Sequence, residues 1–121
     1  MNILLLEDEP SLSAVACEQI ESRGHQVFPA FDIAHARTIL ETERERIDLL
    51  IADQLVPDGN GSEFAIETKE GASGVRVVVV SGQLSDADKE KLGANGVGHY
   101  EKPSLYSEIV EDMERKYFSG S

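Results

Sequence analysis

A carboxylate at the end of a predicted buried strand is the most chemically suggestive feature of the sequence. Residues 49–52 form a continuous apolar run without alternation, which is typical of a strand buried on both faces of a parallel sheet. The run stops at Asp53, and the segment 57–61 then contains a proline, an aspartate and two glycines, a composition typical of a loop. The pattern therefore predicts that Asp53 lies at the carboxyl edge of a sheet, where open α/β folds bind ligands.

Three further predicted strands also end in polar residues. The strand over 2–6 is followed by Glu7 and Asp8, the strand over 75–80 by Ser81, and the short strand around 97–100 by Glu101 and Lys102. Because the carboxyl ends of parallel strands lie at one edge of a sheet, we expect these side chains to share a pocket with Asp53.

The residue types at this edge predict a particular chemistry. Three clustered carboxylates repel one another, and an all-oxygen ligand set without accompanying His or Cys favours Mg²⁺ over zinc. The ammonium of Lys102 and the hydroxyl of Ser81 would complete a receptor for the equatorial oxygens of a phosphoryl group. With Asp53 as the nucleophile the product is an aspartyl phosphate, so the residues predict a phosphoryl-transfer site with Asp53 as acceptor.

Strands and helices alternate along the whole chain. The strands are expected at 2–6, 27–30, 49–52, 75–80 and 97–100, and the helices from Pro10 to Gly24, from the N-cap Asp32 into the charged run 41–46, and over 62–70, 86–92 and 104–117. Five strands alternating with five helices through short connections predict a doubly wound parallel α/β sheet with right-handed crossovers. Pro29 favours an edge position for the second strand, and Leu105 is expected on the buried face of the last helix.

Composition limits the classes of protein to consider. The chain has 121 residues, which suits one domain over residues 1–118, with 119–121 as a frayed end or cloning remnant. There are 23 acidic and 11 basic residues, giving a formal net charge of -12, which disfavours direct contact with nucleic acid or an anionic membrane. The single Cys17 cannot form an internal disulfide. No apolar run approaches the roughly 20 residues of a membrane span, so we expect a cytoplasmic domain.

The order of these motifs resembles the receiver domain of two-component response regulators. The matching residues are Glu7-Asp8-Glu9-Pro10, Asp53 with Pro57 and Gly61, Ser81-Gly82 and Lys102-Pro103. The resemblance spans residues 2 to about 117 and implies a flavodoxin-like sheet of strand order 2-1-3-4-5. It also implies Mg²⁺ as cofactor, bound by Glu7, Asp8, Asp53 and the backbone carbonyl of Leu55.

The resemblance further implies a role in phosphorelay signalling. The phosphoryl group would come from a histidine kinase or a histidine phosphotransfer protein, and Lys102 and Ser81 would contact it. A downstream protein partner or output domain would then read a switched surface. Such a domain is a phosphoacceptor and not an enzyme, although we expect it to dephosphorylate itself.

Two positions depart from the family pattern. The family usually has an aromatic residue three positions before the lysine, and here that position is His99, with Tyr100 next to it. Three alternatives follow: His99 is the switch side chain beside Ser81, Tyr100 takes that role through a local register difference, or aromatic switching is muted. We favour His99. Leu55, two residues after the acceptor, is apolar where some relatives have a polar group, so it could shield the acyl phosphate from water.

Other interpretations of the same residues are weaker but distinct. The chain could be a receiver module from a larger DNA-binding regulator or from a hybrid histidine kinase. A phosphohydrolase of the haloacid dehalogenase type would need a second aspartate two residues after the nucleophile, where Leu55 stands. A flavin- or nucleotide-binding module would need a glycine-rich phosphate loop after the first strand, and Glu7-Asp8 would repel a phosphate without a metal.

Overall fold

The computed structural model describes residues 1–43, 46–71, 74–102 and 106–118. Pro103 of the lysine-proline motif, Leu105 of the last helix and the tail 119–121 lie outside the described residues. Within the described ranges, no helix has the length and apolar character needed to cross a membrane.

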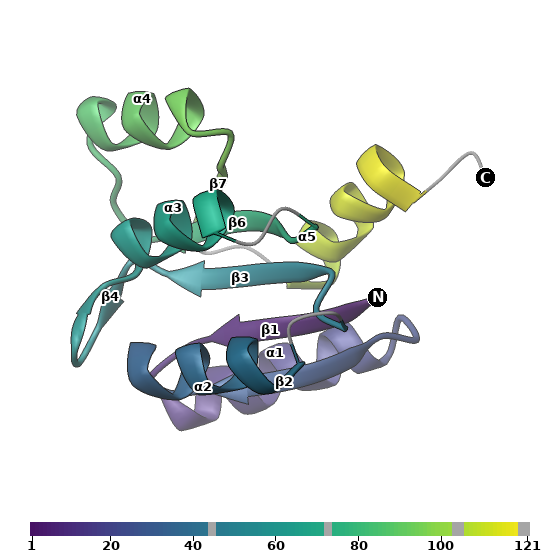
Figure 1. The fold of residues 1–121 in the computed structure, drawn as a ribbon. Coiled ribbons are helices and arrows are strands. Elements are labelled where there is room, and N and C mark those ends of the chain that lie inside the picture. Colours follow the sequence, from purple (N-terminus) through teal and green to yellow (C-terminus); the bar gives the residue numbers. More distant parts are fainter. Residues whose placement is uncertain (44–45, 72–73, 103–105, 119–121) are drawn as a thin grey trace.

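A five-stranded parallel sheet lies at the centre of the fold (Figure 1). Its strands are β1 (Asn2–Leu6), β2 (Gln26–Ala30), β3 (Leu49–Asp53), β6 (Arg76–Ser81) and β7 (Gly98–Glu101). They lie in the order β2-β1-β3-β6-β7, which is the order 2-1-3-4-5 of the predicted strands. The flavodoxin-like arrangement is therefore confirmed, and β2 with its proline is an edge strand, as predicted.

Five α-helices cover the two faces of the sheet. They are α1 (Pro10–Glu21), α2 (Ile33–Glu43), α3 (Gly61–Gly71), α4 (Asp86–Ala94) and α5 (Tyr106–Met113). On one face Ile20 of α1 and Ile109 of α5 pack with the odd-numbered residues of β1. On the other face Phe64 of α3 and Leu92 of α4 pack with residues of α2 and with Leu4. The central strands contact a hydrophobic core on each face of the sheet, which explains why their sequences are continuous apolar runs.

The structure departs from the predicted elements in three places. The first helix was predicted to end at Gly24, but α1 ends at Glu21 and a turn follows over residues 22–24. A loop was predicted after Asp53, but Leu55–Val56 (β4) and Gly59–Asn60 (β5) pair as a small antiparallel hairpin. The last helix was predicted to continue to residue 117, but α5 ends at Met113 and a π-helical turn follows over Glu114–Phe118. The residue types at 57–59 favour the tight turn of a hairpin. Composition alone predicts only a loop for this segment, so the hairpin was missed.

Two aspartates cap the start of α2, and one of them belongs to this hairpin. Asp32 accepts a hydrogen bond from the His35 backbone N–H at 2.8 Å, so its predicted role as the N-cap of α2 is confirmed. Asp58 in the hairpin turn accepts from the N–H groups of Ile33 and Ala34 at 2.8 and 3.0 Å. These two backbone hydrogen bonds, Ile33 first, lower the pKa of the Asp58 carboxyl. Asp58 thus holds the hairpin against the start of α2.

Gly61 fixes the backbone that carries Asp53. Its N–H donates to the carbonyl oxygen of Gln54 at 2.7 Å. A Cβ at position 61 would lie 1.7 Å from the carbonyl oxygen of Asp53, far inside van der Waals contact. The glycine is needed here for this close approach, because any side chain would push the backbone of residues 53 and 54 away from α3.

Replacing Gly61 by alanine should therefore destabilise the protein. We expect Gly61→Ala to lower the free energy of unfolding by about 2 kcal/mol or more, because relief of the clash must displace backbone. Gly71→Ala is the matched control, since a Cβ at the last residue of the same helix meets nothing within 4 Å. Urea unfolding of both variants measures the difference, and equal stabilities would contradict the role given to Gly61.

Candidate functional site

Three carboxylates meet at the carboxyl edge of the sheet. Strands β1 and β3 are neighbours, with Leu6 opposite Ala52. The residues directly after these two, Glu7 and Asp53, therefore lie side by side. A carboxylate oxygen from each of Glu7, Asp8 and Asp53 lies within 4.8 Å of the others. Glu7 is 1% exposed and Asp53 is 9% exposed, whereas Asp8 is exposed to solvent. The structure thus brings together the three acids singled out in the sequence.

Lys102 reaches this cluster from the end of β7. Its Nζ lies 3.1 Å from Asp53 Oδ2 and 3.4 Å from Glu7 Oε1. Its backbone N–H donates to the carbonyl oxygen of Ser81 at 2.8 Å, which fixes where the side chain starts. Burial lowers the pKa of the Lys102 ammonium, but the hydrogen bond and charge of Asp53, together with Glu7, outweigh it and raise the pKa overall. The lysine therefore stays charged beside the acids.

One ammonium does not balance three acids. The pKa of Glu7 is raised to about 7, first by burial and then by the hydrogen bond and negative charge of Asp53, while Lys102 opposes the increase. A buried carboxyl in this position would be stabilised in its ionised form by a second cation. Because the donors are all oxygens and one acid is open to solvent, the set suits a hard divalent ion that keeps some of its water.

The hydroxyl of Ser81 is close to the site but is occupied elsewhere. Ser81 is 4% exposed at the end of β6, and its Oγ donates to Oε1 of Gln54 at 2.7 Å. The same Oγ accepts from the backbone N–H of Gln83 at 3.1 Å. Gln54 was not identified from the sequence, because an amide directly after Asp53 follows no motif. Its only signal was a polar side chain between a buried strand and a turn.

His99 and Tyr100 lie on opposite faces of β7, because successive strand residues alternate. Tyr100 is half-buried against the core shared by α1 and α5, and its hydroxyl donates to Asp112 of α5. His99, opposite Val79 of β6, is exposed and lies on the side of the sheet that α4 covers. The structure thus places His99, and not Tyr100, on the face that leads toward α4.

A cleft of about 780 Å³ opens over the acids. It is lined by Glu7, Asp8, Glu9, Leu12, Asp53, Gln54, Leu55, Ser81, Gly82, Gln83 and Lys102. Leu12 of α1 and Leu55 of β4 are large apolar residues on its rim, 48% and 74% exposed. The cleft therefore combines a charged floor with two apolar edges.

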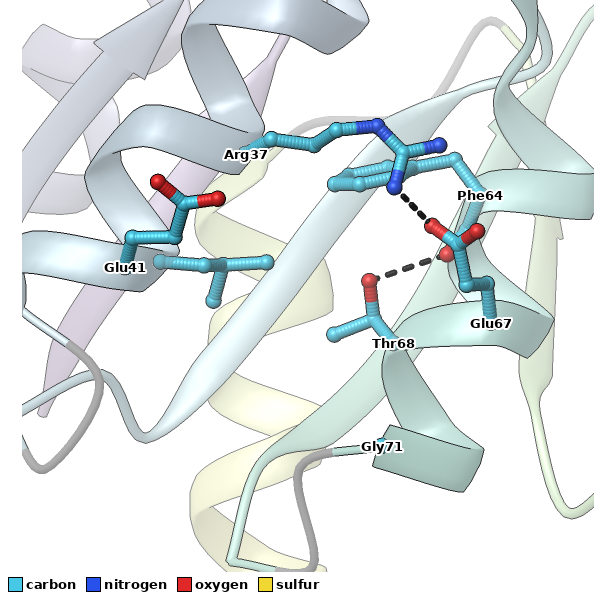
Figure 2. Close-up of a pocket in the computed structure, with 7 residues that line it drawn as sticks. Arg37, Glu41, Phe64, Glu67, Thr68 and Gly71 are labelled. Atoms are coloured by element: carbon cyan, nitrogen blue, oxygen red, sulfur yellow. Dashed lines mark hydrogen bonds and ion pairs between the residues drawn. The ribbon is translucent and has the colours of Figure 1, made fainter.

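A second hollow lies between α2 and α3 and carries no comparable chemistry. It measures about 220 Å³, and Figure 2 shows Arg37 extended across it. The guanidinium of Arg37 lies over the ring of Phe64, 5.3 Å from its centroid, and pairs with Glu67. Thr68 donates to the carbonyl oxygen of Phe64 at 2.9 Å. Because Arg37 is paired with Glu67 and Thr68 with the backbone, this hollow is interpreted as a packing junction between helices.

Comparison with known proteins places this geometry in a family. The family model described as response regulator receiver domain matches residues 3–114. The KDP operon transcriptional regulatory protein KdpE of Escherichia coli (strain K12) is 33% identical over 109 residues, which cover 89% of this chain and 47% of KdpE. The sporulation initiation phosphotransferase F of Bacillus subtilis (strain 168) is 30% identical over 118 residues, which cover 95% of this chain and 91% of that protein.

The solved structures agree on the fold. A CheY-like response regulator receiver domain protein from Methanospirillum hungatei JF-1 superposes with a TM-score of 0.85 at 21% identity, over 95% of this chain and 91% of that chain. The chain spans less than half the length of KdpE but nearly all of the Bacillus protein. The family match over most of the sequence, on a sheet of the predicted strand order, shows that the chain belongs to the response regulator receiver domains of two-component signal transduction.

Proposed function

We propose that this receiver domain accepts a phosphoryl group on Asp53 from a histidine kinase or a histidine phosphotransfer protein. The observation that carries the proposal is the buried Asp53 carboxylate, held 3.1 Å from the Lys102 ammonium and beside two further acids at the floor of an open cleft. A nucleophile needs this combination of access for the donor and positive charge for the phosphoryl oxygens.

The transfer exchanges one bond to phosphorus for another. A carboxylate oxygen of Asp53 attacks the phosphorus of the donor's phosphohistidine, and the P–N bond breaks with its electron pair returning to the imidazole nitrogen. Lys102 then neutralises one equatorial oxygen of the new acyl phosphate. Positioning and charge stabilisation supply the catalysis, because phosphoryl transfer needs little covalent help from the protein.

Mg²⁺ is the cofactor that the acids would hold. Glu7, Asp8 and Asp53 provide carboxylate oxygens within reach of one ion, and the backbone carbonyl of Leu55 is proposed as a further ligand. When bound, the ion would offset the negative charge of the acids and of the phosphoryl group. Burial first, and then the neighbouring Asp53, raise the pKa of Glu7, so a cation bound beside Glu7 would favour its ionised form.

The readout of the phosphoryl group would pass through Ser81 and the β7 face. We propose His99 as the switch residue, because it lies exposed on the α4 side while the Tyr100 hydroxyl is held by Asp112. Relatives named as a transcriptional regulator, a sensor kinase and a phosphotransferase match this chain. We therefore propose that it is one module of a larger regulator or of a hybrid histidine kinase, or a separate relay protein. Autodephosphorylation would return it to the resting state.

Modification of Asp53 tests the central proposal. Incubation with a small acyl phosphate, or with beryllofluoride as its stable analogue, should modify the wild-type protein only when Mg²⁺ is present. Intact-mass spectrometry for the first reagent and fluorine NMR for the second report the product. Asp53→Ala should abolish both signals, whereas Asp86→Ala, an exposed acid of α4, should retain them. A wild-type protein that stays unmodified with Mg²⁺ would refute the proposal.

Removing one acid should expose the repulsion within the cluster. In metal-free buffer at pH 8, Glu7→Gln should raise the free energy of unfolding by about 1 kcal/mol, because a buried charge next to Asp53 is lost while the side-chain volume is kept. Added Mg²⁺ should stabilise the wild type and have much less effect on the variant. Glu90→Gln, an exposed acid of α4, controls for net charge. Thermal melts with and without Mg²⁺ measure both effects, and identical Mg²⁺ responses would contradict the ligand role.

Leu55 should lengthen the life of the acyl phosphate. Its side chain lies on the rim of the cleft, where it would displace water from part of the space over Asp53. Leu55→Asn should shorten the phosphoryl lifetime by about twofold or more, because an amide can hold a water near phosphorus. Val15→Asn, a similarly exposed apolar position on α1, should not change it. Following decay of the phosphorylated protein decides this, and an unchanged lifetime in Leu55→Asn would exclude the shielding role.

A further inference from the structure

A chain of hydrogen bonds links the Ser81 hydroxyl to the first turn of α4. Ser81 Oγ donates to Gln54 Oε1 at 2.7 Å, and Gln54 Nε2 donates to Asp88 Oδ2 at 3.3 Å. The same oxygen of Asp88 accepts from the backbone N–H of Ser85 at 3.2 Å, and the Asp88 N–H donates to Ser85 Oγ at 3.0 Å. Asp88 thus belongs at once to the capping box of α4 and to the surroundings of Gln54.

The charge of Asp88 decides which way the Gln54 amide points. An ionised carboxylate can only accept, so the NH₂ group of Gln54 must face Asp88 and its carbonyl oxygen must face Ser81. The hydrogen bonds from Ser85 lower the pKa of the Asp88 carboxyl, which keeps it ionised. The Ser81 hydroxyl must then be the donor. Although the Gln83 carbonyl lies 3.2 Å from Oγ, Oε1 of Gln54 at 2.7 Å is the nearer acceptor.

We propose that Gln54 is a positioning residue that holds the Ser81 hydroxyl proton away from Asp53 in the resting protein, with its own orientation set by Asp88. The proposal rests on Asp53 being the phosphoacceptor. To contact a phosphoryl oxygen, Ser81 must give up Gln54, which leaves the 8% exposed Gln54 with an unpaired carbonyl. Gln54 therefore opposes the active arrangement by roughly the value of one buried hydrogen bond.

The same contacts would carry the change outward to α4. Of the nine residues of α4, Leu92 alone is buried, so few apolar contacts fix the position of this helix. Its polar attachments include Asp88 to Gln54 and Lys89 to Glu101 of β7, the latter at 2.9 Å. Because coupling between two positions is reciprocal, a helix end that restrains Ser81 is itself shifted when Ser81 moves.

The test compares how fast a small acyl phosphate modifies Asp53 in the presence of Mg²⁺. Gln54→Met keeps the side-chain length and removes both hydrogen bonds, and we expect it to accelerate modification about fivefold. Asp88→Asn should also accelerate it, because the Gln54 amide is then free to rotate and to release the hydroxyl proton. Asp86→Asn, which removes a charge from the same helix end without touching Gln54, should behave as wild type.

A background without the hydroxyl separates positioning from a general structural effect. In Ser81→Ala, neither Gln54→Met nor Asp88→Asn should accelerate modification, because no proton remains to be released. Acceleration that persists in Ser81→Ala would overturn the proposal, as would equal rates in Gln54→Met, Asp88→Asn and wild type. If Gln54→Met fails to fold, the half-buried Asp88→Asn alone decides. A wild type that is never modified refutes the proposed acceptor role and this inference with it; a modified wild type with unresponsive variants refutes this inference only.

Discussion

The mutual repulsion of buried acids at one sheet edge is the constraint on which the rest of the structure depends. Glu7 and Asp53 are held together because β1 and β3 are hydrogen-bonded neighbours in register. The apolar side chains of both strands are buried, which opposes their separation. Lys102, which follows the edge strand β7, offsets part of this repulsion with its positive charge. The remaining repulsion would favour the binding of a divalent cation and, with it, of a phosphoryl group, as proposed for this site.

The carboxyl edge of the sheet has a rigid side at β1 and β3 and an adjustable side at β6 and β7. On the β1–β3 side, Gly61 lies so close to the Asp53 backbone that no side chain fits at position 61. Asp58 holds the neighbouring hairpin against α2. On the β6–β7 side, Gln54 links the Ser81 hydroxyl to Asp88 of α4 by hydrogen bonds, and Leu92 is the single buried residue of that helix. Asp53 therefore has a fixed position, while the groups that would respond to its proposed phosphorylation can exchange one hydrogen bond for another.

Much of the fold could be predicted from local pattern. The continuous apolar runs gave the strands and their burial on both faces, and the polar residue after each run gave the edge at which the site lies. Strand order came from the resemblance to the family and was confirmed. The hairpin after Asp53 and the π-helical turn after α5 were missed, because two-residue strands and a change of helical hydrogen bonding leave little trace in composition.

The sequence by itself determined the set of chemical groups: three acids, a hydroxyl and an ammonium, each placed directly after a strand. Only the tertiary structure decided their partners. Ser81 was expected to contact a phosphoryl group on Asp53, but its hydroxyl donates a hydrogen bond to Gln54, 27 residues earlier in the chain. Gln54 in turn donates to Asp88 of α4. The roles of His99 and Tyr100 could be distinguished only from the position of β7, which places the two side chains on opposite faces of the sheet. Hydrogen bonds between residues distant in sequence depend on packing geometry, which local residue patterns do not encode.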